Sequence, residues 1–382
     1  MSRKHFSWLL ATTLVVALAV LLMPARTGKD TGFERTPLLP ELQQQVNELD
    51  WLRFVGAGDA VIATLQRADD HWRVEEAHGY RADWGRLRAL LADLAQAQVI
   101  EAKTANPEFY ARLGVEEVAA PEASGVRVEF GESSGLPALI VGKAAEGRDG
   151  RYARLQDEAQ SVLIDRGLDL PAAREDWLDK TIVDIADTEV VEFEIRHADG
   201  ERVLARKLSA DDENFQLQDV PEGRQIQSVW TVDSLANSLS SLNLEAVSPE
   251  GEIDWSGAAR FGLVTADGLR LDVDLATHAA PEGGDEGGDE GGAEHWIRVQ
   301  AGVYKTAVES AVESAPPADG ESAEEGNVEG GNVEGMDGAA GRAAEINTRV
   351  SGWAYRIPKY KFDSMSKRMG DLLQEEGSNS GA

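Results

Sequence analysis

Apolar residues recur at helical spacing in two stretches of this chain. The first stretch spans residues 72–100, and the second lies near residues 215–247. In each, a short strand is expected first, and a run of apolar residues spaced three or four apart follows. These residues are Leu87, Leu90, Leu91 and Leu94 in the first stretch, and Val232, Leu235, Leu239 and Leu242 in the second. Such spacing aligns apolar side chains along one side of a helix. The sequence therefore predicts a strand and an amphipathic helix in each stretch.

Shorter apolar and alternating segments bounded by turn residues predict β-strands around both helices. In the first half they lie at residues 51–55, 60–66, 126–130, 138–141, 151–155 and 161–164, and in the second half at residues 190–196 and 202–208. Short connections between successive strands favour antiparallel pairing. The expected fold class is α+β, with mainly antiparallel sheets.

The order of these segments suggests an internal duplication. Several blocks match between the halves at offsets of 142 to 148 residues, among them Asp69-Asp70 with Asp211-Asp212. The residues around Val126 align with those around Leu269. Chance similarity between amphipathic elements is the alternative, but blocks in one order favour repetition. We expect two tandem copies of one sheet-plus-helix unit, at residues 41–180 and 181–372.

The N-terminus has the composition of a membrane anchor. An uncharged run begins at Phe6 and ends at Met23, and its 18 residues would span roughly 27 Å as a helix. A cleavable signal peptide is the alternative, although the residues before Ala25 make a poor cleavage site. Arg3 and Lys4 favour a cytoplasmic N-terminus. The expected order is a cytoplasmic stub (residues 1–5), a transmembrane anchor (6–23) and a spacer (24–40), with the bulk periplasmic at a bacterial inner membrane.

The net charge of −31 over 382 residues argues against nucleic-acid binding, which requires a basic surface. Much of the charge lies in two glycine-rich segments, residues 281–294 and 309–345. On the alignment above, residues 281–294 fall between the strands that match residues 126–130 and 138–141. Their low apolar content predicts that both segments lack order. The tail at residues 373–382 is expected to lack order as well. The chain has no cysteine, which excludes disulfides and thiolate chemistry.

No motif for catalysis, a metal or a cofactor has the context that its chemistry requires. Residues 131–135 fit the G-x-S-x-G pattern around Ser133, but a strand is expected after the serine, where a nucleophile elbow needs a helix. The histidines at 71, 78, 278 and 295 lack the spacing of a zinc pair. We therefore expect no catalytic residues, no metal site and no cofactor, and a serine hydrolase at Ser133 remains a remote alternative.

Aromatic residues are the remaining candidates for a binding surface. Most are expected to fill the core between helix and sheet, and Trp84 and Trp353 are the two predicted to lie exposed. Exposed tryptophans can stack on sugars or anchor a protein partner. They define a weak candidate interaction surface.

Several segments together resemble one bacterial family. They are Trp72-Arg73-Val74, Tyr80-Arg81-Ala82-Asp83, the helix with Leu87 to Leu94, the segment from Asn106 to Val115, and Trp177-Leu178-Asp179-Lys180. The chain is similar here to an uncharacterised family (a domain of unknown function) of single-span envelope proteins often encoded beside ABC transporters and gliding-motility-type auxiliary components. The resemblance covers residues 46–180 well and the second half more loosely. It implies an accessory role near a transporter and supplies no catalytic residues.

These observations favour a noncatalytic, membrane-anchored periplasmic accessory protein that associates with permease or auxiliary subunits of an ABC-type transport or envelope complex. The alternative is a periplasmic glycan- or solute-binding module that uses exposed aromatic residues.

Overall fold

The computed structural model describes residues 35–69, 71–209, 212–279, 292–304 and 330–374, with the side chains of residues 330–336 excepted. These residues form two compact units. The first holds the described residues up to His71 together with Trp84–Ala172, and the second holds Trp72–Asp83 together with the residues from Ala173 onward. Residues 72–83, which the sequence pattern places in the first repeat, group with the second unit by their contacts.

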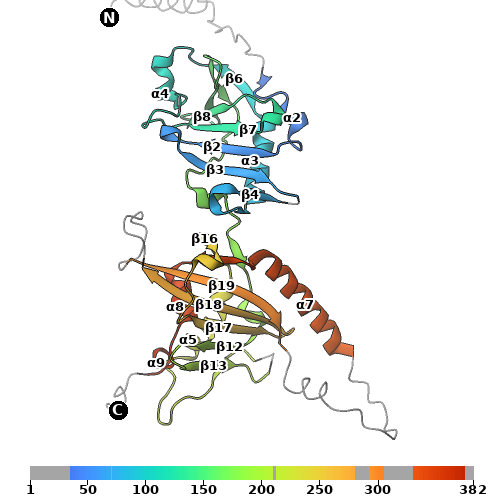
Figure 1. The fold of residues 1–382 in the computed structure, drawn as a ribbon, viewed down its shortest axis with the longest axis vertical. Helices are drawn as coiled ribbons and strands as arrows, with labels where there is room; N and C mark the ends of the chain where they lie inside the picture. The colour runs from blue at the N-terminus through green and yellow to red at the C-terminus, as the bar shows by residue number, and fades with distance from the viewer. Residues whose placement is uncertain (1–34, 70, 210–211, 280–291, 305–329, 375–382) are drawn as a thin grey trace, which may run out of the picture. The chain divides into compact units, whose positions relative to one another are not determined.

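The first unit contains eight antiparallel strands in the order β1-β6-β10-β9-β8-β7-β2-β3 (Figure 1). The strands are β1 Thr36–Pro37, β2 Trp51–Val55, β3 Val61–Arg67, β6 Gln98–Ala102, β7 Val126–Phe130, β8 Leu139–Ala144, β9 Arg151–Leu155 and β10 Ser161–Ile164. The prediction gave the bounds of β2, β7, β9 and β10 correctly. β3 and β8 begin one residue later than predicted.

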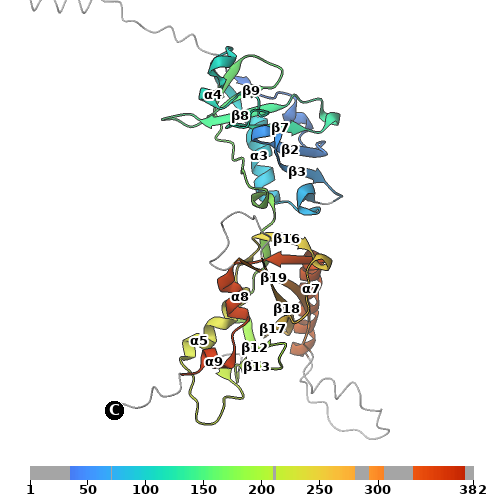
Figure 2. The same cartoon turned by 60° about the vertical axis from the view of Figure 1, so that its left-hand side comes forward.

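Three α-helices accompany this sheet among the described residues: α2 Leu42–Gln45, α3 Trp84–Gln96 and α4 Tyr110–Leu113. The predicted leucine stripe of α3 is confirmed as core, because all four leucines are buried. Helix α3 lies beside the sheet in both views (Figures 1 and 2). Burial of each such side chain contributes about 1.5–3 kcal/mol, so this stripe holds α3 in place.

The second unit contains an eight-stranded antiparallel sheet in the order β14-β13-β12-β17-β18-β19-β20-β16. Its strands are β12 Val190–Arg196, β13 Arg202–Arg206, β14 Gln216–Leu217, β16 Ala246–Pro249, β17 Ala259–Thr265, β18 Leu269–Ala279, β19 Ala293–Val303 and β20 Trp353–Arg356. The unit also holds β4 Trp72–Val74, which pairs with β5 Tyr80–Arg81, and a two-stranded sheet of β11 Thr181–Val183 and β15 Leu242–Asn243. The observed class is α+β with large antiparallel sheets, as predicted.

The second unit has four α-helices among the described residues, and a helix was predicted only in the region of the first of them. They are α5 Val229–Asp233, α7 Gly330–Val350, α8 Lys359–Met365 and α9 Met369–Leu372. The single helix expected from Val232 to Leu242 is instead the short α5, a 3₁₀ helix at Ser234–Leu239 and then β15. Val232, Leu235, Leu239 and Leu242 are nevertheless buried. The apolar spacing therefore identified the core positions correctly but not the continuous helix.

Helix α7 corrects the expectation that all of residues 309–345 would lack order. It packs against β18 and β19 and buries Ala339, Ala343 and Val350. The Asn347 side chain donates to the Ala301 carbonyl of β19 at 2.8 Å and accepts from the Ala301 N–H at 2.9 Å. Local composition predicted disorder, but tertiary packing of a small apolar stripe stabilises a helix that would be marginal alone.

The two sheets share one strand order over seven strands. From one edge, the first sheet reads β6-β10-β9-β8-β7-β2-β3, and the second reads β16-β20-β19-β18-β17-β12-β13. Corresponding strands also follow one another in the same order along the chain. On this basis β7 corresponds to β17, whereas the sequence alignment paired it with the segment that forms β18. The segment at residues 281–294 therefore follows the counterpart of β8, one strand later than expected.

The structure corrects two predictions at the ends of the chain, and two others fall on residues that it does not describe. The stub at residues 1–5 and the anchor at residues 6–23 lie outside the described residues. Within the described part, no helix is long and apolar enough to cross a membrane. The expected spacer ends early, because Thr36 pairs with β6 and Leu39 is buried. The expected tail begins late, because Leu373 is buried and bridges Ile226.

Candidate functional site

An aromatic and polar cluster in the second unit is built around Tyr80. Tyr80 stands on β5, whose pairing with β4 sets Val74 opposite Tyr80. The chain turns between these strands through a 3₁₀ helix, Glu75–Ala77, and two residues with positive φ, His78 (57°) and Gly79 (77°). This tight turn presents the Tyr80 side chain to the rest of the unit, where it is fully buried.

Tyr80 packs against two aromatic residues of β20. Trp353 and Tyr355 are two positions apart on this strand and therefore share one face of it. The Tyr80 ring meets both edge to face, with centroid distances of 5.0 Å to Trp353 and 6.0 Å to Tyr355. Aromatic pairs in this geometry stabilise by about 0.5–1.5 kcal/mol beyond the area they bury.

The two phenol groups of the cluster stay protonated at physiological pH. Burial raises the pKa of Tyr80, although the adjacent Arg81 acts to lower it. Burial, and then the neighbouring Tyr80, raise the pKa of Tyr355 far above its ordinary range. The interaction between the two hydroxyls acts to lower the pKa of Tyr80 and to raise that of Tyr355. Neither tyrosine can thus serve as an anionic base.

Charged residues and main-chain bonds connect the residue 72–83 segment to the segment after Ala173. Arg81 forms an ion pair with Asp179 at 3.3 Å and donates to the Tyr80 hydroxyl at 3.4 Å. The Asp83 N–H donates to the carbonyl of Trp177, which is itself buried, and the Asp179 N–H donates to the Arg81 carbonyl. These contacts explain why Trp72–Asp83 belongs to the second unit.

Arg349 lies in the last turn of α7 and acts electrostatically on Tyr355. Its Nη2 donates to the Ile182 carbonyl of β11 at 2.8 Å. Among the described residues it forms no ion pair with a carboxylate, and its Nε is buried without a hydrogen-bond partner. The cluster itself combines the Arg81 guanidinium, the Asp179 carboxylate and two protonated phenols.

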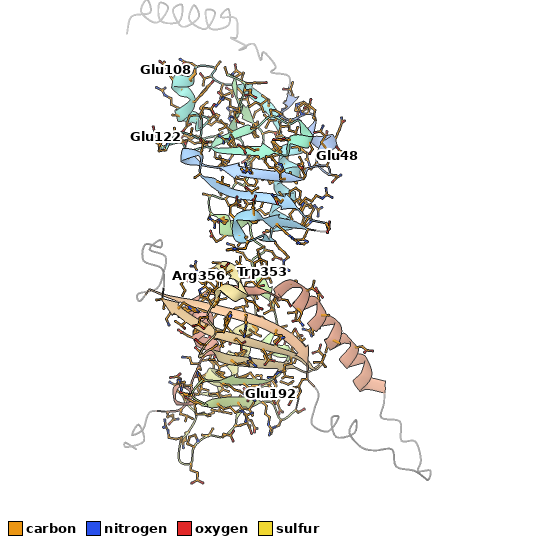
Figure 3. The ribbon with its side chains drawn as sticks, in the orientation of Figure 1. Glu48, Glu108, Glu122, Glu192, Trp353 and Arg356 are labelled. Atoms are coloured by element: carbon orange, nitrogen blue, oxygen red, sulfur yellow. The ribbon has the colours of Figure 1, made fainter. Side chains whose placement is uncertain are left out.

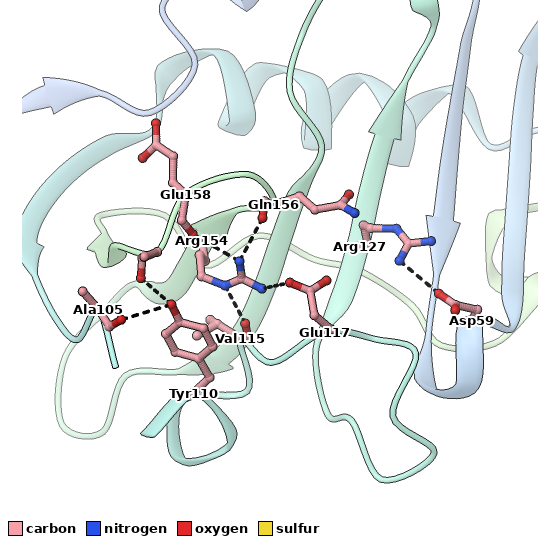
Figure 4. A network of polar contacts seen from close by, with 10 residues as sticks. Asp59, Ala105, Tyr110, Val115, Glu117, Arg127, Arg154, Gln156 and Glu158 are labelled. Atoms are coloured by element: carbon pink, nitrogen blue, oxygen red, sulfur yellow. Dashed lines mark hydrogen bonds and ion pairs between the residues drawn. The ribbon is translucent and has the colours of Figure 1, made fainter. Parts of the chain in front are cut away.

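A second polar network lies in the first unit and is centred on Arg154 (Figure 4). Arg154 is 3% exposed and donates to the carbonyls of Val115 (2.9 Å), Gln156 (3.0 Å) and Glu158 (3.2 Å). It also pairs with Glu117, and its guanidinium lies 4.7 Å from the centre of the Tyr110 ring. Because these donors are committed to main-chain carbonyls and one carboxylate, Arg154 holds the loops around β9 together.

The two tryptophans of the predicted interaction surface lie in different units. Trp84 is the first residue of α3 in the first unit and is 54% exposed. Trp353, which Figure 3 labels beside Arg356, is half-buried against Tyr80 in the second unit. Trp84 thus has the exposure that a contact residue needs, and Trp353 is partly committed to packing. Trp230 was among the aromatic residues expected to fill the core, but it is 76% exposed near the start of α5.

Ser133 lies in a single 3₁₀ turn, Glu132–Ser134, between strands β7 and β8. Its hydroxyl donates to the Asp50 carboxylate at 3.3 Å. A strand follows, as the sequence predicted, where a nucleophile elbow has a helix. The local geometry is that of a hairpin connection.

The histidines considered as metal ligands do not converge. His278 of β18 pairs with Glu294 in the register, and His295 is the next residue of β19. Because side chains alternate along a strand, His278 and His295 point to opposite faces of the sheet. No three potential ligands gather at one point in the part of the chain that the structure describes.

The sequence pattern selects Trp353 but does not indicate that Tyr80 packs against both Trp353 and Tyr355. The signal was present in part, since Tyr80 and Arg81 carried the family resemblance. Nothing in the pattern indicated that residues separated by about 270 positions in the chain would meet, because that depends on which unit the β4–β5 hairpin joins.

A family model described as a domain of unknown function (DUF4340) matches residues 72–263. The match starts at the first residue of β4 and ends within β17, so it runs through parts of both units. No significant match to a curated protein or to a solved structure was found. Since the matched residues make up just over half of the 382-residue chain, this protein belongs to the DUF4340 family.

Proposed function

We propose that this protein is a noncatalytic accessory protein of the bacterial envelope. Residues 6–23 anchor it in the inner membrane, the bulk is periplasmic, and it associates with permease or auxiliary subunits of an ABC-type transport complex. The transporter association rests on the family resemblance of the segments between residues 46 and 180. The anchor rests on the uncharged run from Phe6 to Met23.

The observation that carries the proposal is the shared strand order of the two sheets. We infer that it arose by internal duplication, and that the product is a scaffold with two similar sheets and separate outer surfaces. The buried charged residue Arg154 supports a structural role, because its donors bind main-chain carbonyls and Glu117. A catalytic arginine would keep donors free for substrate.

A photo-crosslinking residue at position 84 tests this function. Trp84 is exposed, so a nearby transporter subunit should form an adduct with a probe at that position. The matched control is a probe at Trp177, which is 1% exposed and should form none. If probes at Trp84, Trp230 and Tyr360, all exposed, yield no adduct with another envelope protein in living cells, the accessory role is contradicted.

A glycan- or solute-binding module is the second candidate. The exposure of Trp84 and Trp230 favours it, because exposed indole rings can stack on sugar rings. Titration with envelope polysaccharides should then quench or shift tryptophan fluorescence, and Trp84→Ala or Trp230→Ala should remove part of that change. An unchanged spectrum across a glycan panel excludes this candidate.

A further inference from the structure

Four arginines form one row across the sheet of the second unit. Strands β13, β12, β17, β18 and β19 lie side by side in that order (Figure 1). Arg202 of β13 pairs in register with Arg196 of β12, and Arg196 pairs with Arg260 of β17. Asp274 of β18 follows, and then Arg298 of β19. Paired residues of neighbouring strands lie on the same face, so these five side chains share one face of the sheet. We call the four arginines the arginine row.

The arginine row breaks the usual pairing of charges on a sheet. Like charges directly opposite each other destabilise a sheet, yet Arg196 has an arginine opposite it on both neighbouring strands. The corresponding strands of the first sheet, β2 and β7, instead set Arg53 opposite Glu129. Departures from such local rules are expected at functional sites.

Two carboxylates hold the arginine row in place without covering it. Glu194 pairs with the arginines of β12 and β13, and Asp274 pairs with those of β17 and β19. The two carboxylate side chains are 10% and 14% exposed, whereas the arginine side chains are 37% to 62% exposed. Burial acts to raise the pKa of both carboxyl groups, but hydrogen bonds from the arginines lower the pKa by more. Both carboxylates therefore stay ionised at neutral pH, and two negative charges accompany four positive ones.

The terminal Nη groups of the arginine row remain open to an acceptor. All four arginines contact their carboxylate through Nε, at 2.7 Å for Arg260 and 2.9 Å for Arg196 and Arg298. Within the described ranges, none of their Nη groups has an acceptor. The Arg298 guanidinium also lies 4.8 Å from the centre of the Trp255 ring, an attractive contact that restricts its motion. Side chains that are already held lose less conformational freedom on binding.

We propose that the arginine row docks an acidic segment of a protein partner. Guanidinium groups bind carboxylates through a fork of two donors. Glu194 and Asp274 show that a carboxylate fits between neighbouring arginines of this sheet. The row crosses four gaps between strands, about 19 Å, which an extended segment of about six residues spans. Alternate side chains of such a segment face the row, so its acidic residues should lie at every second position.

Charge favours this partner over other occupants. The chain has a net charge of −31, so its acidic surfaces repel an acidic segment and a positive face directs it to one place. A lipid surface is less suited, because interfacial binding uses exposed apolar side chains beside the cations, and the arginine row has none. Such docking requires neither the membrane anchor nor a transporter subunit, so its failure would leave the accessory role standing.

Fluorescence anisotropy of a labelled hexapeptide in which glutamate alternates with glycine tests this surface, with the full-length protein in detergent. The expected result is saturable binding that weakens as the salt concentration rises. The same peptide with glutamine in place of glutamate should not bind. Arg196→Gln should weaken binding by about tenfold, the effect of one lost charge-assisted hydrogen bond. It should not lower the melting temperature, because it removes both oppositions of like charge.

Arg148→Gln is the matched control, because Arg148 lies in the first unit, is 47% exposed and likewise takes part in an ion pair. This variant should bind the glutamate peptide as the wild type does. The proposal is overturned if the wild type does not bind the glutamate peptide, or binds both peptides equally. It is also overturned if Arg196→Gln and Arg260→Gln bind as the wild type does.

Two further outcomes would overturn the proposal by naming another occupant. Binding to phosphatidylglycerol vesicles without binding to the peptide would identify a lipid surface. Peptide binding that appears only after the acidic residues of 281–290 and 309–329 are replaced by asparagine and glutamine would identify the chain's own acidic segments.

Discussion

The ring of Tyr80 meets the ring of Trp353 edge to face at 5.0 Å between centroids, although the two residues are far apart in the chain. Tyr80 comes from a short hairpin that interrupts the first unit in sequence, and Trp353 begins the strand β20 of the second unit. The second unit therefore includes core residues from the N-terminal half. A fragment that begins at residue 173 would lack Tyr80 in that core.

Replacement of Tyr80 with alanine should destabilise the second unit. The side chain is fully buried, so its loss leaves a cavity beside Trp353 and Tyr355. We expect a decrease of about 3–5 kcal/mol in the free energy of unfolding, measured by urea denaturation. Tyr360→Ala, at an exposed tyrosine of the same unit, should change it by less than about 0.5 kcal/mol. Equal midpoints for the two variants would contradict this assignment of Tyr80.

Arg154→Met should destabilise the first unit strongly. The change removes the donors to the carbonyls of Val115, Gln156 and Glu158 but retains most of the apolar volume. The cost should be about 3–5 kcal/mol, because buried acceptors lose their partners. Glu117→Gln should cost less than about 1 kcal/mol, since Glu117 is 55% exposed. Thermal unfolding of both variants provides the comparison, and a larger loss for Glu117→Gln would refute the network as described.

Gly142→Ala should also destabilise the first unit, for steric reasons. A Cβ atom at position 142 would lie 2.3 Å from the Leu113 carbonyl oxygen, which belongs to the main chain and cannot rotate away. Gly167→Ala is the matched control, because a Cβ there meets nothing within 4 Å. We expect a lower melting temperature for Gly142→Ala and an unchanged or slightly higher one for Gly167→Ala. The reverse order would show that α4 does not approach β8 this closely.

The stability of the second unit should fall in acid partly through Asp274. Burial raises the pKa of this carboxyl, but the hydrogen bonds from Arg260 and Arg298 lower the pKa by more than burial raises it. The net shift of the pKa is therefore downward. A carboxyl whose pKa is lowered in the folded state stabilises the protein at pH values above the pKa of the same group in the unfolded chain, about 3.9. This contribution is lost as the pH falls through the pKa of the folded state.

Asp274→Asn should therefore reduce the free energy of unfolding at pH 7. As the pH falls below 5, this variant should lose less stability than the wild type. Urea unfolding at a series of pH values measures both slopes. Parallel curves for the two proteins at all pH values would mean that Asp274 does not contribute to the acid sensitivity.

The strands were predicted from sequence more accurately than the helices, for physical reasons. Segments such as Val126–Phe130 and Val190–Arg196 have β-branched and aromatic residues bounded by turn residues, and these local signals determine their ends. The composition of the α7 segment predicts disorder, but the segment is helical because Ala339, Ala343 and Asn347 pack against the sheet. Such contacts between distant segments cannot be predicted from the local sequence.

The candidate site was predictable only in part. Trp353 was selected because it is aromatic, and Trp84 was correctly predicted to be exposed. The packing of Tyr80 against Trp353 and Tyr355 depends on the unit to which the β4–β5 hairpin belongs. The sequence alignment of the two halves paired β7 with the segment that forms β18, whereas the strand orders of the two sheets match β7 with β17. Amphipathic strands of similar length match one another at several offsets.

The accessory role is tested most directly by crosslinking intact cells, capturing the full-length protein from solubilised membranes and identifying its partners by quantitative mass spectrometry. The proposal predicts enrichment of ABC-type permease or auxiliary subunits over a capture from cells in which the chain lacks residues 1–34. Recovery of the full-length protein alone, or from the soluble fraction only, would contradict the proposal.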